Sequence, residues 1–192
     1  MTKLHSLLLF LLVACQATPA PHPALEPPIR VRRRGDSISI GYTPHVREAL
    51  QHSAVVVRPT REGGAAENCQ GTTHGVQHVQ RWLQLEGGDW DIIHFNFGLH
   101  DLKRVDPVSR KNSNLVSDPN QAPPEVYAQQ LRTSVEALSA TDARLVVATT
   151  TPVPEGGVRP HRDPQDVERY NRLALAVMEE FDVEVDDLYA FA

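Results

Sequence analysis

The chain has 192 residues, of which 41% are hydrophobic and 22% are charged, with a formal net charge of −5 and a pI near 6.0. This composition excludes a disordered or fibrous protein and leaves room for one domain with its own core. The negative charge offers no basic surface of the kind that nucleic-acid binding requires, so a small or neutral ligand fits the chain better.

The first fourteen residues have the pattern of an export signal. Lys3 precedes an apolar run over residues 6–14 that is too short to span a bilayer. The run ends in Leu-Val-Ala-Cys, which resembles the bacterial lipobox, so residues 1–14 are predicted to be removed and Cys15 to become a lipidated membrane anchor. Plain secretion after cleavage near Ala17 or Ala20 is the alternative. Both interpretations export the protein, either to the bacterial cell envelope as a lipoprotein or outside the cell.

Residues 15–28 are rich in proline, which favours an extended tether, and residues 29–192 are predicted to form the domain. In this domain short β-like runs alternate with helical patterns, which indicates parallel strands joined by helical crossovers. Strands are expected at residues 29–34, 54–58, 91–97, 144–150 and 183–187, and helices at residues 46–51, 75–85, 124–138 and 164–180. Residues 103–123 have no periodicity and are interpreted either as a loop that frames the site or as a mobile surface insertion.

The run Gly35-Asp36-Ser37 lies where the first strand ends and a helix is expected to begin. Open α/β sheets bind ligands at this edge, and helix amides near a serine there can stabilise a developing anion. Two further elements follow in order, each at the end or the beginning of an expected element. The first contains Gly71 just before a helix, and the second is Gly98-Leu99-His100-Asp101 after a strand.

These blocks together resemble the SGNH/GDSL hydrolase superfamily, with Gly-Leu-His-Asp in place of the usual Gly-x-Asn-Asp. The resemblance continues to the C-terminus through residues 151–153 and 170–171. It implies a flavodoxin-like, three-layer α/β/α sandwich with a parallel central sheet. It also implies a serine esterase that cleaves small acyl esters, such as acetyl groups on carbohydrate, through an acyl-serine intermediate and without a metal or other cofactor.

By the same resemblance Ser37 is the nucleophile, and its backbone amide together with that of Gly71 forms part of an oxyanion hole. His100 stands where the family has asparagine. A neutral imidazole N–H can donate to the oxyanion from that position, as the asparagine amide does. A general-base role for His100 and a purely structural role are the alternatives.

The sequence departs from the family in two places. No Asp-x-x-His follows the last expected strand, where the family has it, so the general base has no matching position, and the chain is interpreted as truncated at its C-terminus. The expected central strand is also rich in arginine, which predicts a frayed or partly exposed strand, or a decaying gene. Activity is therefore in doubt, and the alternative function is a non-catalytic surface lipoprotein that uses the same cleft to bind a glycan or a protein partner.

Overall fold

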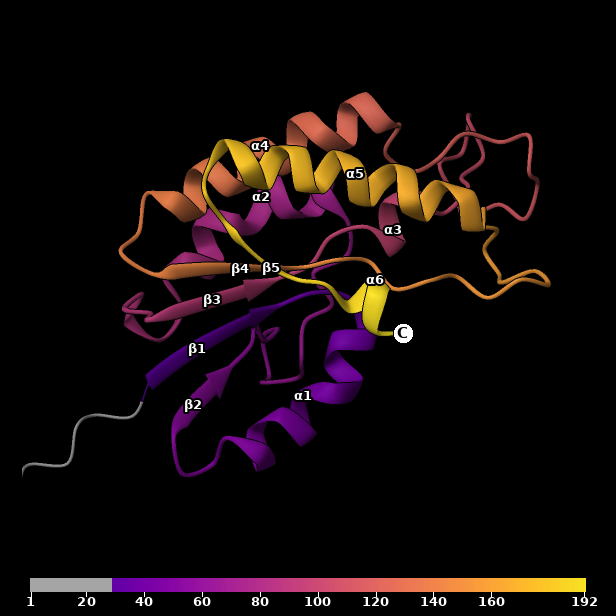
Figure 1. Ribbon diagram of the computed structural model, residues 1–192. Coiled ribbons are helices and arrows are strands. Elements are labelled where there is room, and N and C mark those ends of the chain that lie inside the picture. Colours follow the sequence, from indigo (N-terminus) through magenta and orange to yellow (C-terminus); the bar gives the residue numbers. More distant parts are fainter. Residues whose placement is uncertain (1–28) are drawn as a thin grey trace, which may run out of the picture.

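The computed structural model describes residues 29–192, which form a five-stranded parallel sheet with helices on both faces (Figure 1). The predicted signal at residues 1–14, the lipidation site Cys15 and the tether at residues 15–28 lie outside the described residues. The strand order is β2-β1-β3-β4-β5, so the chain first moves outward to one edge and then crosses back over β1 to the other edge. The strands are β1 (Ile29–Arg34), β2 (Ala54–Val57), β3 (Ile92–Phe95), β4 (Arg144–Ala148) and β5 (Glu184–Asp186).

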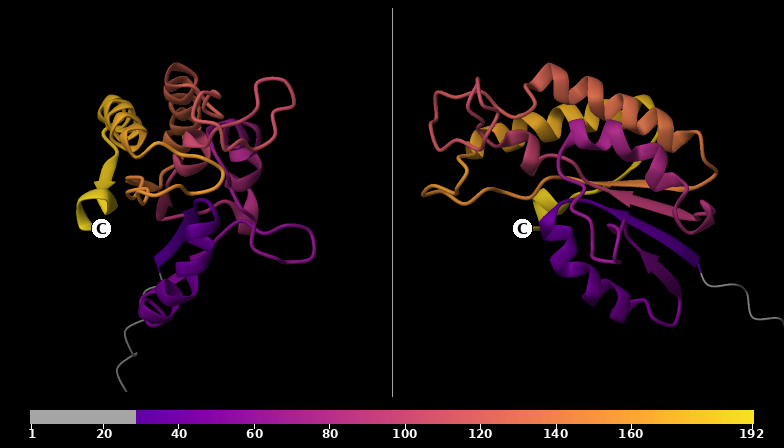
Figure 2. Two further views of the ribbon diagram at one scale, coloured as in Figure 1. Left: turned by 90° about the vertical axis from the view of Figure 1, so that its right-hand side faces the viewer. Right: turned by 180° about the vertical axis from the view of Figure 1, so that it is seen from behind.

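The helices divide unequally between the two faces of the sheet (Figures 1 and 2). Three long helices cover one face: α2 (Thr72–Leu83), α4 (Pro124–Ser139) and α5 (Pro164–Glu180). On the other face α1 (Ser37–Ala49) packs against β1 and β2, and the short α6 (Leu188–Phe191) lies near its first turn. This arrangement confirms the three-layer α/β/α sandwich that the sequence predicted.

The core lies between the sheet and the layer of three helices. Ile93 and Phe95 of β3 and Val147 of β4 share the sheet face toward this layer, and all three are buried. On the helices, buried residues recur at helical spacing, such as Leu131, Val135 and Leu138 of α4. The 3.6-residue periodicity that predicted α2, α4 and α5 therefore marks the faces that they bury.

The arginine-rich strand is not frayed, but the alternative expectation that it is partly exposed is confirmed, because Ile29 is 48% exposed and Arg30 and Val31 are half-buried. β1 forms parallel ladders with both β2 and β3. Arg32 lies on the face of the three helices and is fully buried, with its guanidinium 3.8 Å from the centre of the Trp90 ring. Its Nη2 donates to the Leu85 carbonyl at 3.0 Å, so aromatic stacking and a carbonyl replace an acidic partner.

Residues 103–123 form an ordered loop that is tied to the segment before α5. Arg104 donates its amide to the His161 carbonyl, and the Arg104 side chain bonds both Asn120 and Asp166 of α5. Val105, which belongs to this loop, is buried. The loop therefore braces the segment from β4 to α5 from outside, and its residues do not line the cavities described below.

The structure also adds elements that the sequence analysis missed. α1 begins at Ser37, nine residues before the expected helix at 46–51, and the short α3 (Leu99–Leu102) and a 3-10 turn at Leu85–Gly87 were not expected. Within residues 29–192 no helix is both long enough and apolar enough to cross a membrane.

Candidate active site

Ser37 is the first residue of α1, directly after the turn that leaves β1. Asp36 caps the helix, because its side chain accepts a hydrogen bond from the Ile38 amide at 2.9 Å. The Ser37 side chain is exposed, whereas Gly35 and Asp36 are buried. The turn thus presents the hydroxyl at the carboxyl edge of the sheet and at the positive end of a 13-residue helix.

Ser37 and His100 line one cavity of about 270 Å³. His100 belongs to α3, which follows β3 in the same way that α1 follows β1. Two sequence blocks that lie 63 residues apart therefore meet at one edge of the sheet. The rest of the wall is largely apolar and comes from Asp36, Ile38, Leu99, Thr151, Pro152, Val153, Pro154, Val158 and Arg162.

The His100 ring is half-buried, and its Nδ1 is buried without a hydrogen-bond partner among the described residues. Burial, followed by the nearby charges of Lys103 and Arg162, lowers the pKa of His100 to about 4. The ring is therefore neutral at pH 7. A neutral ring still carries one N–H that can donate to an anion, but it is a weak proton acceptor.

Gly71 does not line this cavity, although the loop that carries it lies against the Ser37 turn. The Cys69 amide donates to the Gly35 carbonyl at 3.2 Å, two residues before Gly71. Gly71 precedes α2, and a side chain there would strike the carboxyl group of Asp101, whose Oδ1 would lie 2.6 Å from the added Cβ. Glycine at position 71 is thus required by the close approach of α3.

Asp101 holds the first turn of α2 against α3. Its Oδ1 accepts from the amide of Thr72 at 2.8 Å and from the Thr72 hydroxyl at 2.7 Å. The carboxyl group is completely buried, and this burial raises its pKa to about 6 although the hydrogen bonds from Thr72 oppose the shift. Asp101 therefore fixes the position of Gly71 relative to His100.

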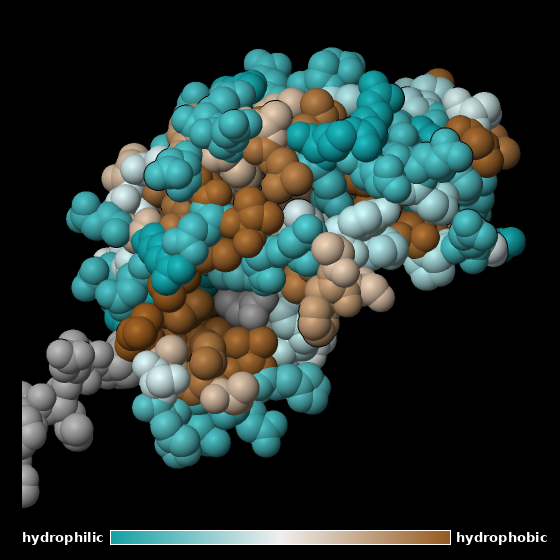
Figure 3. Space-filling view, in the orientation of Figure 1, coloured by the Kyte–Doolittle hydropathy of each residue, from teal (hydrophilic) through white to brown (hydrophobic). Residues whose placement is uncertain are grey.

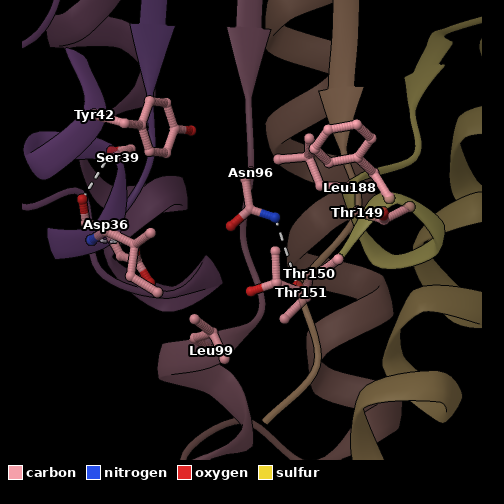
Figure 4. Close-up of a pocket in the computed structure, with 12 residues that line it drawn as sticks. Asp36, Ser39, Tyr42, Asn96, Leu99, Thr149, Thr150, Thr151 and Leu188 are labelled. Atoms are coloured by element: carbon pink, nitrogen blue, oxygen red, sulfur yellow. Dashed lines mark hydrogen bonds between the residues drawn. The ribbon is translucent and has the colours of Figure 1, made fainter. Parts of the chain in front are cut away.

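A second cavity of about 190 Å³ adjoins the first and shares Asp36, Ile38, Leu99 and Thr151 with it (Figure 4). Asn96 projects into this cavity from the end of β3, and its amide donates to the Ala148 carbonyl at 2.7 Å. The rest of the wall comes from α1, from the segment after β4 and from the C-terminus: Ser39, Tyr42, Thr149, Thr150, Leu188, Phe191 and Ala192. Sequence reasoning missed Asn96, although its place at the carboxyl end of a parallel strand is a usual position for a functional residue.

The segment after β4 is held in place by α5. The Asn171 side chain accepts from the Thr150 amide and donates to the Thr150 carbonyl, both at 2.9 Å. Thr150 in turn lies so close to Gly98 that any side chain at position 98 would overlap its hydroxyl. Residues 151–153 and 170–171, which resemble the superfamily in sequence, thus lie on two segments that are hydrogen-bonded to each other beside the cavity.

No histidine other than His100 lines either cavity in the part of the chain that the structure describes. His94 bonds Asp186 across the sheet at 3.0 Å, and His74 stacks on His78 along α2. Within residues 29–192 no group of three or more His, Cys, Asp or Glu residues is arranged to hold a metal ion.

A family model described as the GDSL-like Lipase/Acylhydrolase family matches residues 35–192. No curated protein matches the sequence significantly.

Several solved structures have a similar fold. An acetyl xylan esterase, AlAXEase, has a TM-score of 0.63 and 11% identity, and the match covers 85% of this chain and 79% of that chain. A lipase/acylhydrolase from Enterococcus faecalis has a TM-score of 0.58 and 18% identity, with coverage of 85% and 77%. The SGNH-hydrolase family esterase AlinE4 has a TM-score of 0.57 and 16% identity, with coverage of 84% and 77%. At these identities the likeness extends to the fold alone.

Proposed function

The chain belongs to the GDSL-like lipase/acylhydrolase family, and on this premise we propose that it hydrolyses small acyl esters with Ser37 as the nucleophile. The observation that carries the proposal is the common cavity of Ser37 and His100. Acetyl groups on carbohydrate are the proposed substrates. A small cavity suits a short acyl group, and the similar AlAXEase is described as an acetyl xylan esterase.

In the proposed reaction the Ser37 Oγ attacks the ester carbonyl carbon, and the carbonyl oxygen becomes an oxyanion. The backbone amide of Ser37 and the neutral N–H of His100, which both line the cavity, are proposed to donate to this oxyanion. The Gly71 amide is a proposed third donor from the adjacent loop, outside the cavity wall. Expulsion of the alcohol leaves an acyl-serine, which water then hydrolyses to release the acid and restore the hydroxyl.

The proton of Ser37 needs an acceptor that can pass it to the departing alcohol. The one Asp-x-x-His after Ser37, at residues 91–94, ends on β3, where His94 bonds Asp186 and lines neither cavity, so solvent water is left to accept the proton. We therefore expect slow turnover by this chain. The rival proposal, a surface lipoprotein that binds a glycan or a protein partner through the same cavity, is favoured by this same observation.

Hydrolysis of 4-nitrophenyl acetate by the full chain tests the proposal. The hydrolysis rate of wild-type protein is expected to exceed that of Ser37→Ala. Ser139→Ala, which removes an exposed hydroxyl at the end of α4, is expected to have the wild-type rate.

His100→Ala is expected to lower kcat about 100-fold, because one oxyanion donor is lost, and His100→Asn is expected to retain most activity through its amide. Equal rates for wild type and Ser37→Ala would reject the enzyme in favour of the binding protein. An unchanged rate in His100→Ala would reject only the donor role.

Export and lipidation at Cys15 remain a proposal that rests on the sequence of residues 1–15. Incorporation of radiolabelled palmitate in a bacterial host should be lost in Cys15→Ser. A protein that is never labelled would contradict the anchor.

A further inference from the structure

Arg162 places a guanidinium group in the wall of the Ser37 cavity. The residue lies just before α5 and is half-buried. Its Nε donates to the Leu99 carbonyl at 2.6 Å and its Nη1 to the Pro160 carbonyl at 3.3 Å. Both acceptors are uncharged, so these bonds orient the guanidinium without neutralising it.

The far end of Arg162 lacks a partner among the described residues. Its Nη2 makes no hydrogen bond there, and no carboxylate of residues 29–192 lies within 4 Å of the guanidinium. Arg104 is also half-buried, but it is ion-paired with Asp166 at 3.1 Å. Because a desolvated charge is costly, an unpaired guanidinium in a cavity wall indicates a site for an anion that arrives with the ligand.

The charged groups near Arg162 do not prevent it from binding an anion. Asp36, the carboxylate that faces Arg162, is buried and bonds the Ile38 amide as a helix cap. Lys103 is half-buried near Arg162 and has no ion pair within the described chain. Its pKa is lowered by burial and by the Arg162 charge, while Asp101, which is bonded to Thr72, opposes the shift. Lys103 therefore adds a second positive charge near Arg162, but only Arg162 lines the cavity. Both nearby carboxylates are engaged by backbone amides.

We propose that the cavity accepts esters that carry a carboxylate close to the scissile bond, and that Arg162 is the specificity-determining residue that binds this carboxylate. The inference rests on the proposed ester hydrolysis. A planar guanidinium matches the two oxygens of a carboxylate, and the apolar wall of Ile38, Leu99 and Val158 strengthens the interaction by excluding water. The substrate class is thus a half-ester of a dicarboxylic acid, or an acetyl ester of a hydroxy acid such as an acidic sugar.

Matched ester pairs test the proposal on the full chain and distinguish the two sources of the carboxylate. The acyl side is tested with the 4-nitrophenyl half-ester of adipic acid against 4-nitrophenyl hexanoate. The alcohol side is tested with 4-acetoxy-3-nitrobenzoate against 4-nitrophenyl acetate. Ser37→Ala supplies the background rate for each ester.

In Arg162→Gln, kcat/KM for at least one anionic ester is expected to fall tenfold or more relative to its neutral partner, because a charge-assisted pair is lost. Arg61→Gln removes an exposed positive charge from the loop after β2 and is expected to leave every ratio unchanged. Equal losses for the anionic and neutral esters in Arg162→Gln, with an unfolding temperature like that of wild type, would overturn the proposal and leave the esterase intact.

Binding provides a readout that does not need turnover. If no ester is hydrolysed above the Ser37→Ala rate, the proposed function fails, and adipate is titrated by calorimetry into Ser37→Ala and into Ser37→Ala/Arg162→Gln. At least tenfold weaker binding to the double variant would support the carboxylate site. Absent or equal binding would overturn it.

Discussion

At the scale of single residues, burial decides the charge of the groups around Ser37. Desolvation raises the pKa of Asp36, although backbone amides of Ile38 and Ser39 oppose the shift. Desolvation also keeps His100 neutral by lowering its pKa to about 4, and it raises the pKa of Asp101 to about 6. The same cause therefore acts in opposite directions on an acid and on a base.

Asp101 leads to a prediction about pH. The folded state holds the Asp101 proton more tightly than the unfolded chain, whose pKa is near 3.8. Its contribution to the free energy of unfolding is therefore fully present below about pH 4 and is lost as the pH rises through about 6. The free energy of unfolding of wild type is therefore expected to fall, relative to that of Asp101→Asn, by on the order of a few kcal/mol between about pH 4 and 6.

Urea unfolding of wild type and Asp101→Asn between pH 4 and 7 measures this difference. Asp142→Asn, at an exposed position, controls for the loss of a surface carboxylate. The measured value is the free energy of unfolding of wild type minus that of Asp101→Asn. If this value stays constant or increases from pH 4 to 7, the raised pKa of Asp101 is contradicted.

At the scale of elements, β1 shows how a strand can bury arginine without an acidic partner. Arg32 stacks on Trp90 and bonds one carbonyl, but its Nε and Nη1 have no hydrogen-bond partner among the described residues. Burial lowers its pKa to about 10. A desolvated cation–π contact contributes about 2 kcal/mol, less than the several kcal/mol that burial of an unpaired ion costs.

Arg32→Met is therefore expected to raise the free energy of unfolding by about 1–3 kcal/mol, because methionine fills a similar space without unpaired donors. Denaturant unfolding measures the change. Arg30→Met, at a side chain that remains 32% exposed, is the matched control and should change stability by less than about 1 kcal/mol. A less stable Arg32→Met would show that stacking on Trp90 outweighs desolvation.

At the scale of the whole molecule, the sheet is covered unevenly. Three long helices cover one face of the sheet. On the other face α1 packs against β1 and β2. Figure 3 shows apolar residues gathered where β1, β2 and α1 lie. Val55 of β2 is 46% exposed. β2 is an edge strand, so this surface combines exposed apolar side chains with unpaired backbone groups, which favours self-association.

Val55→Lys is accordingly expected to raise the protein concentration at which aggregation begins and to leave the unfolding temperature nearly unchanged, since Val55 is 46% exposed. Val56→Lys is the matched control. Val56 is 5% exposed, so lysine there should lower the unfolding temperature by burying a charge. Light scattering during a thermal ramp reports both quantities, and unchanged aggregation in Val55→Lys would contradict the role of this edge.

The sequence alone determined the fold class, the five strands and the three long helices, because periodicity and turn residues are local properties of the chain. The sequence also indicated that Ser37 and His100 lie at the carboxyl edge of the sheet, since each follows a predicted parallel strand. Only the tertiary structure decided what depends on contacts between distant segments: the burial that sets the charge of His100 and Asp101, and the stacking that accommodates Arg32. The position of Arg162 in the cavity is of the same kind, because it depends on a carbonyl of α3 that lies 63 residues earlier in the chain.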